Sequence, residues 1–312
     1  MAQGKNRKIK IRAYIPPFLQ KGENKMGSKN LWDGYKGLMA YYDNLVNAGK
    51  PVCPIAHTYI TCHIGVLIDS DGVFLCAKAP DVKGELLPVP CTVKSETRTS
   101  NIAPHLLHDN LCYVADYGVK YRSRHDAYMD QLKKYVDCCP HDLYAKAIYK
   151  YVSKNTLVND IKDILNDYDC PDYAHDKLNI IFCVYGMRNE GEDKQWTEWY
   201  IKQLIPNGVC CITGESDYIP DAYPKCITSP NGKEILFEKG SHVGYIAAQK
   251  IIHAIQYLIY GIRNRGRVEA EKKLKDFLNQ KITKEELKAW VTEKYSGKWD
   301  KLKKIICEGE NE

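Results

Sequence analysis

A short polar loop in the first third of the chain carries residue types suited to an extended, anionic, hydrogen-bonding ligand. The loop holds one cation, Arg98, beside three small polar residues, Thr99, Ser100 and Asn101, and Lys94 lies just before it. Arginine and asparagine suit the edges of base pairs, whereas hydroxyl groups and lysine suit phosphates. An apolar segment after Pro104 would give the loop a packed base. The composition fits nucleic acid, although an ordinary polar turn before a helix carries the same residue types for local reasons.

A second basic segment lies at the start of the chain. Residues 1–30 hold eight Lys or Arg and a single acid, and residues 261–312 hold fourteen Lys or Arg and ten acids. Since the whole chain has a net charge of only +6, the centre of the chain is acidic. A protein that coats nucleic acid would be basic throughout, so contact with nucleic acid should be local. The segment is either a solvated tail or an arm that becomes ordered on RNA or DNA. Its candidate contacts are Lys5, Arg7, Lys8, Lys10 and Arg12.

Residues for catalysis or metal binding do not form a recognisable set. The sequence has no phosphate-binding loop, no dinucleotide fingerprint, no nucleophile elbow and no CxxC motif. Cys210, Cys211 and Cys226 lack the paired spacing of a zinc site. We therefore predict no enzyme activity, no metal and no cofactor. A weaker alternative is a metal-dependent enzyme acting on nucleic acid through His105, His108 and Asp109.

Length and composition narrow the type of protein that the chain can be. The chain has 312 residues, of which 44% are hydrophobic and 27% charged, as expected of a globular protein with one large domain or two modest ones. No apolar run is long enough for a membrane span, and residues 1–30 lack the apolar core of a secretory signal. Thirteen scattered cysteines fit buried thiols in a reducing compartment. We therefore predict a cytoplasmic protein without membrane contact.

Hydrophobic periodicity predicts an α+β fold: an antiparallel sheet with a hairpin in the first half, packed with several helices, and a short helical C-terminal tail. The turn Asp69–Gly72 between two apolar runs is a strong hairpin signal. Helices are expected over residues 30–46, 125–136, 141–152, 156–165 and 243–262, and strands over residues 63–69, 73–78, 86–93 and 178–185. The predicted organisation is a basic arm over residues 1–30, a core over residues 31–262 and a charged helical tail over residues 263–312.

An ordered series of short segments resembles the large subunit of the type I-C CRISPR surveillance complex, Cascade. The resemblance covers roughly residues 31–262. Its segments are CPIAH (53–57), HIGVLIDSDGVF (63–74), PCT (90–92), RTS (98–100), APH (103–105), DNLCYVA (109–115), TLV (156–158), CITGE (211–215) and AQK (248–250), followed by His253 and Ala254. No single segment is decisive, but their order and spacing are specific.

The resemblance implies a non-catalytic subunit that inspects the protospacer-adjacent motif (PAM) of double-stranded DNA and assists opening of the duplex. It implies as partners crRNA, target double-stranded DNA, the handle-binding and backbone Cascade subunits, a small subunit and a helicase-nuclease. On this reading Arg98, Thr99, Ser100 and Asn101 approach the PAM, while Lys94 and the basic arm add attraction independent of sequence.

Family members of this kind are longer and end in a helical bundle, so the resemblance implies a compact or truncated form here. An alternative is a decoy or regulatory paralogue that occupies the large-subunit position without licensing degradation of the target.

Overall fold

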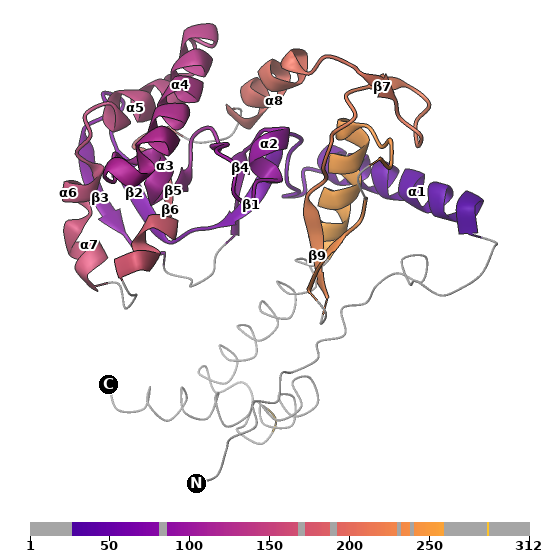
Figure 1. The fold of residues 1–312 in the computed structure, drawn as a ribbon, viewed down its shortest axis with the longest axis horizontal. Coiled ribbons are helices and arrows are strands. Elements are labelled where there is room, and N and C mark those ends of the chain that lie inside the picture. Colours follow the sequence, from indigo (N-terminus) through magenta and orange to yellow (C-terminus); the bar gives the residue numbers. More distant parts are fainter. Residues whose placement is uncertain are drawn as a thin grey trace. The chain divides into compact units, whose positions relative to one another are not determined.

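The structure, a computed structural model, describes residues 27–80, 86–167, 172–187, 192–229, 232–237 and 240–258, together with residue 286. The chain divides into two units, residues 1–256 and 257–312. Nearly all of the described residues belong to the first unit (Figure 1). The predicted tail over residues 263–312, apart from residue 286, and the basic arm through residue 26 lie outside the described residues. The predicted domain boundaries therefore stay predictions.

A four-stranded sheet in the order β3–β2–β6–β5 lies at the centre of the core. Its strands are β2 (Ile64–Ile68), β3 (Phe74–Lys78), β5 (Asp109–Asn110) and β6 (Asn179–Val184). The predicted hairpin is confirmed, because β2 and β3 pair antiparallel around the Asp69–Gly72 turn. β5 also pairs antiparallel with β6, whereas β2 pairs parallel with β6, a contact between segments more than a hundred residues apart.

The other elements of the first unit surround this sheet or extend from it. They are α1 (Gly27–Asn47), β1 (His57–Thr61), β4 (Leu86–Pro90), α2 (Val93–Glu96), α3 (Leu111–Val114), η2 (Val119–Tyr121), α4 (Arg122–Cys138), α5 (Leu143–Val152), α6 (Leu157–Asp160), α7 (Lys162–Asp167), η3 (Asp172–Lys177), α8 (Glu192–Gln203), β7 (Gly208–Val209), β8 (Ser216–Asp217), β9 (Lys225–Ser229) and β10 (Gly232–Ile235). A further helix runs over residues 245–258. The α+β class is confirmed.

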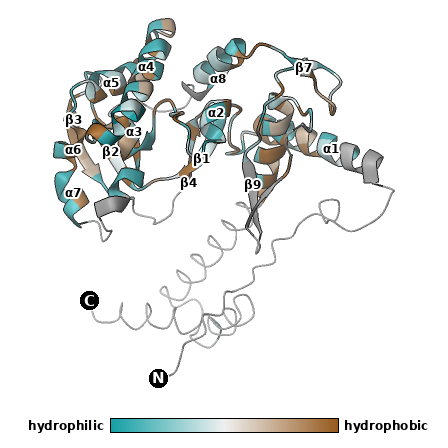
Figure 2. Cartoon of the chain, viewed as in Figure 1, coloured by the Kyte–Doolittle hydropathy of each residue, from teal (hydrophilic) through white to brown (hydrophobic). Residues whose placement is uncertain are grey.

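The hydrophobic core lies between one face of the sheet and the helices α4 and α5. The alternate β2 residues Ile64, Val66 and Ile68 are fully buried, as strand periodicity requires. α4 buries a stripe of side chains that includes Tyr128 and Leu132, and Figure 2 shows hydrophilic and hydrophobic residues alternating along this helix. Several tyrosines are thus core residues.

The start of α5 is fixed by a buried polar contact with α4. Asp142 caps the helix by accepting a hydrogen bond from the backbone N–H of Ala145 at 2.9 Å, and it accepts a second from the Tyr135 hydroxyl at 2.7 Å. The two helices are thereby joined through one carboxyl group.

The prediction of one helix over residues 156–165 is wrong. The structure has two short helices, α6 and α7, with a break at Ile161. Asp160 Oδ2 at the end of α6 accepts hydrogen bonds from the hydroxyls of Tyr151 and Thr156, at 2.8 and 2.7 Å. These side-chain bonds anchor the last turn of α6 against α5, and the buried Ile161 turns inward there instead of continuing a straight helix.

The β4 segment has the edge character that its prolines predict. β4 pairs only with β1 among the described strands, in a two-stranded antiparallel sheet in which Pro88 faces Tyr59 and Pro90 faces His57. A proline is tolerated there because neither strand is flanked on both sides. Across the described residues, none of the helices combines the length and apolar character that a bilayer span requires.

The tight hairpin turn gives a first testable prediction. Gly72 has φ of +70°, and a Cβ atom added to it would lie 2.7 Å from the Tyr151 backbone nitrogen and 2.8 Å from the Ala147 carbonyl oxygen. Gly72→Ala should lower the free energy of unfolding by about 2–3 kcal/mol, because it adds a backbone clash with α5 to the unfavourable φ. Chemical denaturation of the full chain measures this change.

Gly186→Ala is the matched control. Gly186 has φ of +75° but no atom within 4 Å of the added Cβ, so its replacement should cost only about 1 kcal/mol of backbone strain. Equal losses for the two variants would contradict the close approach of the turn to α5.

Candidate nucleic-acid interface

The predicted loop follows the short helix α2, and side-chain hydrogen bonds fix both ends of this helix. Thr92 Oγ1 accepts a hydrogen bond from Ser95 N at 3.0 Å, and Thr92 N donates to Ser95 Oγ at 2.8 Å. This reciprocal arrangement is a capping box, and it defines where α2 begins. At the other end, the Thr97 hydroxyl donates to the Val93 carbonyl at 2.9 Å. The chain therefore enters the loop in a defined direction.

The loop is closed by an ion pair between Arg98 and Asp109. Arg98 Nη1 donates to Asp109 Oδ2 at 2.6 Å, and Arg98 Nη2 donates to Asp109 Oδ1, so the contact is bidentate. Arg98 also donates to the Ala103 carbonyl at 2.8 Å. Its guanidinium lies over the Tyr113 ring, 4.6 Å from the centroid. One arginine thus holds the middle of the loop, its end and the helix that follows.

Asp109 is fully buried, and both of its carboxylate oxygens accept hydrogen bonds. Its side chain has 0% exposure, against 16% for Arg98. Besides Arg98, it accepts hydrogen bonds from the backbone N–H groups of His105 at 2.8 Å and Asn110 at 2.7 Å. Burial lowers the pKa of Arg98, but the Asp109 carboxylate raises it more, so Arg98 stays charged. Removing either partner would leave the other as a buried charge without compensation.

The tip of the loop is exposed. Thr99, Ser100 and Asn101 are all exposed, and the next residue, Ile102, has 47% exposure. Thr99 N donates to Asn101 Oδ1 at 3.3 Å, which organises the tip locally. Lys94, on α2, is exposed as well. Of the five loop contacts predicted from the sequence, four are therefore accessible, and Arg98 is committed to Asp109.

Beneath α2, one hydrogen-bonded chain joins four segments that are distant in the sequence. Gln249, on the helix over residues 245–258, donates through Nε2 to Glu96 Oε2 at 2.7 Å and accepts through Oε1 from Ala56 N at 3.0 Å. The Ala56 carbonyl accepts in turn from Cys91 N at 2.8 Å and from Trp196 Nε1 at 2.9 Å. Ala56 has φ of +61°, an unfavourable value for a residue other than glycine. These bonds hold it in that conformation.

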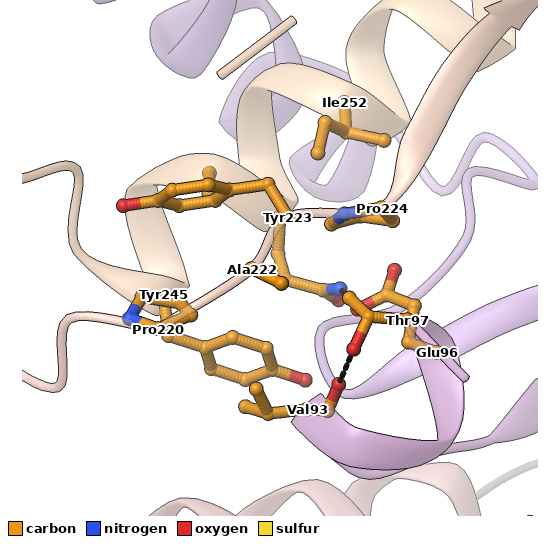
Figure 3. Close-up of a pocket in the computed structure, with 11 residues that line it drawn as sticks. Val93, Glu96, Thr97, Pro220, Ala222, Tyr223, Pro224, Tyr245 and Ile252 are labelled. Atoms are coloured by element: carbon orange, nitrogen blue, oxygen red, sulfur yellow. Dashed lines mark hydrogen bonds between the residues drawn. The ribbon is translucent and has the colours of Figure 1, made fainter. Parts of the chain in front are cut away.

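The joint beside Glu96 is almost completely filled. Figure 3 shows Val93, Glu96 and Thr97 from α2 and its end, together with Tyr223, Tyr245 and other residues that line this joint. The remaining cavity has a volume of about 10 Å³, room for one water molecule at most. It is therefore a packed support for the loop and has no space for a ligand.

Two titratable groups under the loop are held in their neutral forms. Burial raises the pKa of Glu96 to about 8, although the hydrogen bond from Gln249 acts in the opposite direction. Burial lowers the pKa of His105 to about 4, and its Nδ1 lies 3.0 Å from Ser95 Oγ. At neutral pH the Arg98–Asp109 pair is therefore the main charged contact at the base of the loop.

The residues of the metal-dependent alternative do not converge. Asp109 is saturated by Arg98 and backbone groups, His105 contacts Ser95, and His108 Nδ1 accepts from Phe182 N at 3.2 Å. Within the part of the chain that the structure describes, no group of three or more His, Cys, Asp or Glu residues is arranged to hold a metal ion. Cys210 is buried and Cys211 exposed, whereas the side chain of Cys226 is outside the described set. The basic-arm residues Lys5, Arg7, Lys8, Lys10 and Arg12 also lie outside the described residues.

Sequence reasoning missed the residues that shape the loop. It treated Asp109 as a possible metal ligand and did not single out Ala56 or Gln249. One signal for Asp109 was available: it is the only acid between Glu96 and Asp116, it stands close to apolar runs on both sides, and a buried acid requires a cation nearby. Both Arg98 and Asp109 belong to the segments on which the family resemblance was based.

Comparison with protein-family models gives a match for much of the core of the chain. A family model described as CRISPR-associated protein (Cas_Csd1) matches residues 38–236, which is more than half of the chain. No curated protein matches the chain. The matched range includes α2, the loop, Asp109 and the central sheet.

Proposed function

Because the chain belongs to the Cas_Csd1 family of CRISPR-associated proteins, we propose that it is the large subunit of a type I-C surveillance complex guided by crRNA. In this role it recognises the PAM of double-stranded DNA through the loop after α2, assists duplex opening and R-loop formation, and provides a docking surface for the helicase-nuclease. Its partners are crRNA, the handle-binding and backbone subunits and a small subunit. The subunit itself performs no catalysis.

The observation that carries this proposal is a loop with a rigid base and a polar, exposed tip. The Arg98–Asp109 pair fixes the base, so the tip can meet DNA without first being ordered. Asn101 offers an amide that can bond the edge of an adenine, and the hydroxyls of Thr99 and Ser100 can bond phosphates. A complex guided by RNA needs only a few such contacts, because base pairing supplies the remaining specificity.

We divide the predicted contacts into three roles. The Arg98 guanidinium is bonded to a fully buried carboxylate, so reading a base edge would require it to leave Asp109 uncompensated. We therefore assign base contact to Asn101 and the positioning of the loop to Arg98. Lys94, exposed on the preceding helix, adds attraction to phosphates that does not depend on sequence.

Binding of duplex DNA by the assembled complex tests the proposal. Asn101→Ala should weaken binding to the preferred PAM by about 5- to 150-fold and leave the other duplexes nearly unchanged, because a base contact is worth about 1–3 kcal/mol. Lys94→Ala should weaken binding to all duplexes alike and reduce the salt dependence. The measurement is a titration of guide-loaded complex against duplexes that differ only next to the protospacer, at several salt concentrations.

The two variants serve as controls for each other. Both residues are exposed, so neither change should alter thermal stability. If Asn101→Ala weakens every duplex equally, or has no effect on any of them, the assignment of base contact to this loop is wrong.

A further inference from the structure

A second site lies outside the loop, in a cavity between the end of α3 and the segment joining α5 to α6. The cavity has a volume of about 420 Å³ and is lined by residues 114–118 on one side and by residues from 152 to 159 on the other. This volume lies in the range of small-molecule sites, roughly 300–1,000 Å³. None of the roles assigned above to the loop uses this cavity.

The walls combine apolar surface with a few polar groups. Val114, Val152 and Leu157 are buried residues that contribute apolar surface. Asn155 and Asn159 add exposed amide groups, and Tyr117 adds a half-buried ring. A flat ligand with apolar faces and a hydrogen-bonding edge fits such a lining, and a nucleobase is a ligand of this kind.

One polar atom of the lining has an unfilled hydrogen-bonding position. Asp116 Oδ2 accepts from Arg122 Nη2 at 2.9 Å, but Oδ1 is buried and has no hydrogen-bond partner within the described part of the chain. Leaving a buried acceptor unpaired costs about 1–3 kcal/mol. Asp116 therefore contributes a carboxylate, held by Arg122, to the polar part of the lining.

The region beside the cavity carries positive charge, which a bound anion would balance. The first turn of α4 contains Arg122 and Arg124 and no acid, and its N-cap residue, Tyr121, makes no side-chain capping bond. Cations are unfavourable at this end of a helix, because the backbone dipoles already make it positive. Lys120, also exposed, lies immediately before the helix. Asp116 and Asp176, whose Oδ2 accepts a hydrogen bond from the Tyr121 hydroxyl at 2.9 Å, offset part of this charge.

Aromatic rings keep these cations in place. The Arg124 guanidinium lies 5.6 Å from the centroid of the Tyr113 ring and 5.5 Å from that of Tyr121, and Lys120 Nζ lies 4.8 Å from the Tyr121 centroid. The rings of Tyr117 and Tyr121 are 6.2 Å apart. Interleaved cations and aromatic rings are characteristic of surfaces that bind single-stranded nucleic acid.

We propose that this cavity receives one unpaired nucleobase of a single-stranded nucleic acid, whose phosphate is held by Lys120, Arg122 and the first turn of α4. This inference rests on the proposed function, since a surveillance complex brings both guide RNA and displaced DNA to the protein. Guide RNA and displaced DNA can both offer an unstacked nucleotide, and the experiment distinguishes these two sources.

Fluorescence anisotropy of the full chain with labelled oligonucleotides tests this site. The probes are a short cytidine homopolymer and an abasic strand of the same length, each with ribose and with deoxyribose. Wild-type protein should bind the cytidine strand about 5- to 150-fold more tightly than the abasic strand, since a contacted base contributes about 1–3 kcal/mol. A preference for ribose identifies guide RNA as the source, and a preference for deoxyribose identifies displaced DNA. Equal binding means that the site contacts only base and phosphate.

Two variants separate the base contact from the phosphate contact. Asn159→Trp, at an exposed position of the wall, should fill the cavity and abolish the preference for the cytidine strand while leaving abasic binding unchanged. Lys120→Ala should weaken both strands. Lys134→Ala, which removes an exposed lysine elsewhere on α4, should weaken neither strand, and unchanged thermal midpoints show that all variants are folded.

Three outcomes would overturn the inference. The first is equal affinity of the wild-type protein for cytidine and abasic strands. The second is an Asn159→Trp variant that is stable and retains the full preference. The third, no binding of either strand, would also count against the proposed function. If the wild-type protein shows no preference for the cytidine strand, but Asn101→Ala still abolishes PAM discrimination, this site is rejected and the proposed function is kept.

Discussion

Replacing Asp109 with alanine is expected to lower the free energy of unfolding by about 3–5 kcal/mol, because the change leaves a buried guanidinium without its carboxylate. The same variant should lose discrimination between PAMs in the assembled complex, since Arg98 no longer ties the loop to its end. Chemical denaturation of the full chain measures the first effect, and titration with duplex DNA measures the second.

Asp137→Ala provides the control for the loss of an ion pair. Asp137 pairs with Lys133 one helical turn away, and both side chains are more than half exposed. Removing this carboxylate should change the free energy of unfolding by less than about 1 kcal/mol. A loss of the same size for Asp109→Ala would show that the Arg98–Asp109 pair does not organise the loop.

Replacing Glu96 with glutamine should remove a dependence of stability on pH. The pKa of this carboxyl is about 8 in the folded protein, whereas an ordinary glutamate has a pKa of 4.5. The folded state therefore favours the protonated form. Its contribution to stability is complete below pH 4.5 and is lost as pH rises through the folded pKa, near 8. Since one pKa unit corresponds to about 1.4 kcal/mol, the loss across this window is on the order of 3–5 kcal/mol.

The comparison between wild type and Glu96→Gln isolates this group. Glutamine keeps an acceptor for Gln249 and cannot ionise, so the variant should be as stable as wild type at pH 5 and clearly more stable at pH 9. His105 and His253, whose pKa values burial lowers to about 4 and about 3, destabilise both proteins equally in acid. Parallel stability curves from pH 5 to pH 9 would show that the Glu96 carboxyl is not buried in its neutral form.

Local sequence patterns predicted the elements of the fold well and their pairing less well. The Asp-Gly turn located the β2–β3 hairpin, and apolar spacing located α4, α5 and β6 to within a few residues. The parallel pairing of β2 with β6 was not predicted, because it joins segments whose own patterns carry no information about each other. The break between α6 and α7 was missed for a similar reason, since it depends on the Tyr151 hydroxyl of a neighbouring helix.

Residue type selected the candidate site, and its contact with nucleic acid stays a prediction. The structure shows that Lys94 and Asn101 are exposed, which a contact with nucleic acid requires. Arg98 illustrates the difficulty, because a guanidinium suits a guanine edge and a buried carboxylate equally well. Only the fold shows that its fork is directed at Asp109, eleven residues later.

The support of the loop also bears on how the protein acquires its structure. The hydrogen bond between Ala56 and Gln249 joins positions 193 residues apart, and the bond from Trp196 to Ala56 spans 140 residues. Contacts of such long range form late, since closing a large loop must precede any gain from them. A nascent chain emerging from the ribosome therefore exposes the segment around Arg98 well before the residues that brace it have been translated. The loop can take up its braced form only after Gln249 has been translated and has left the ribosome.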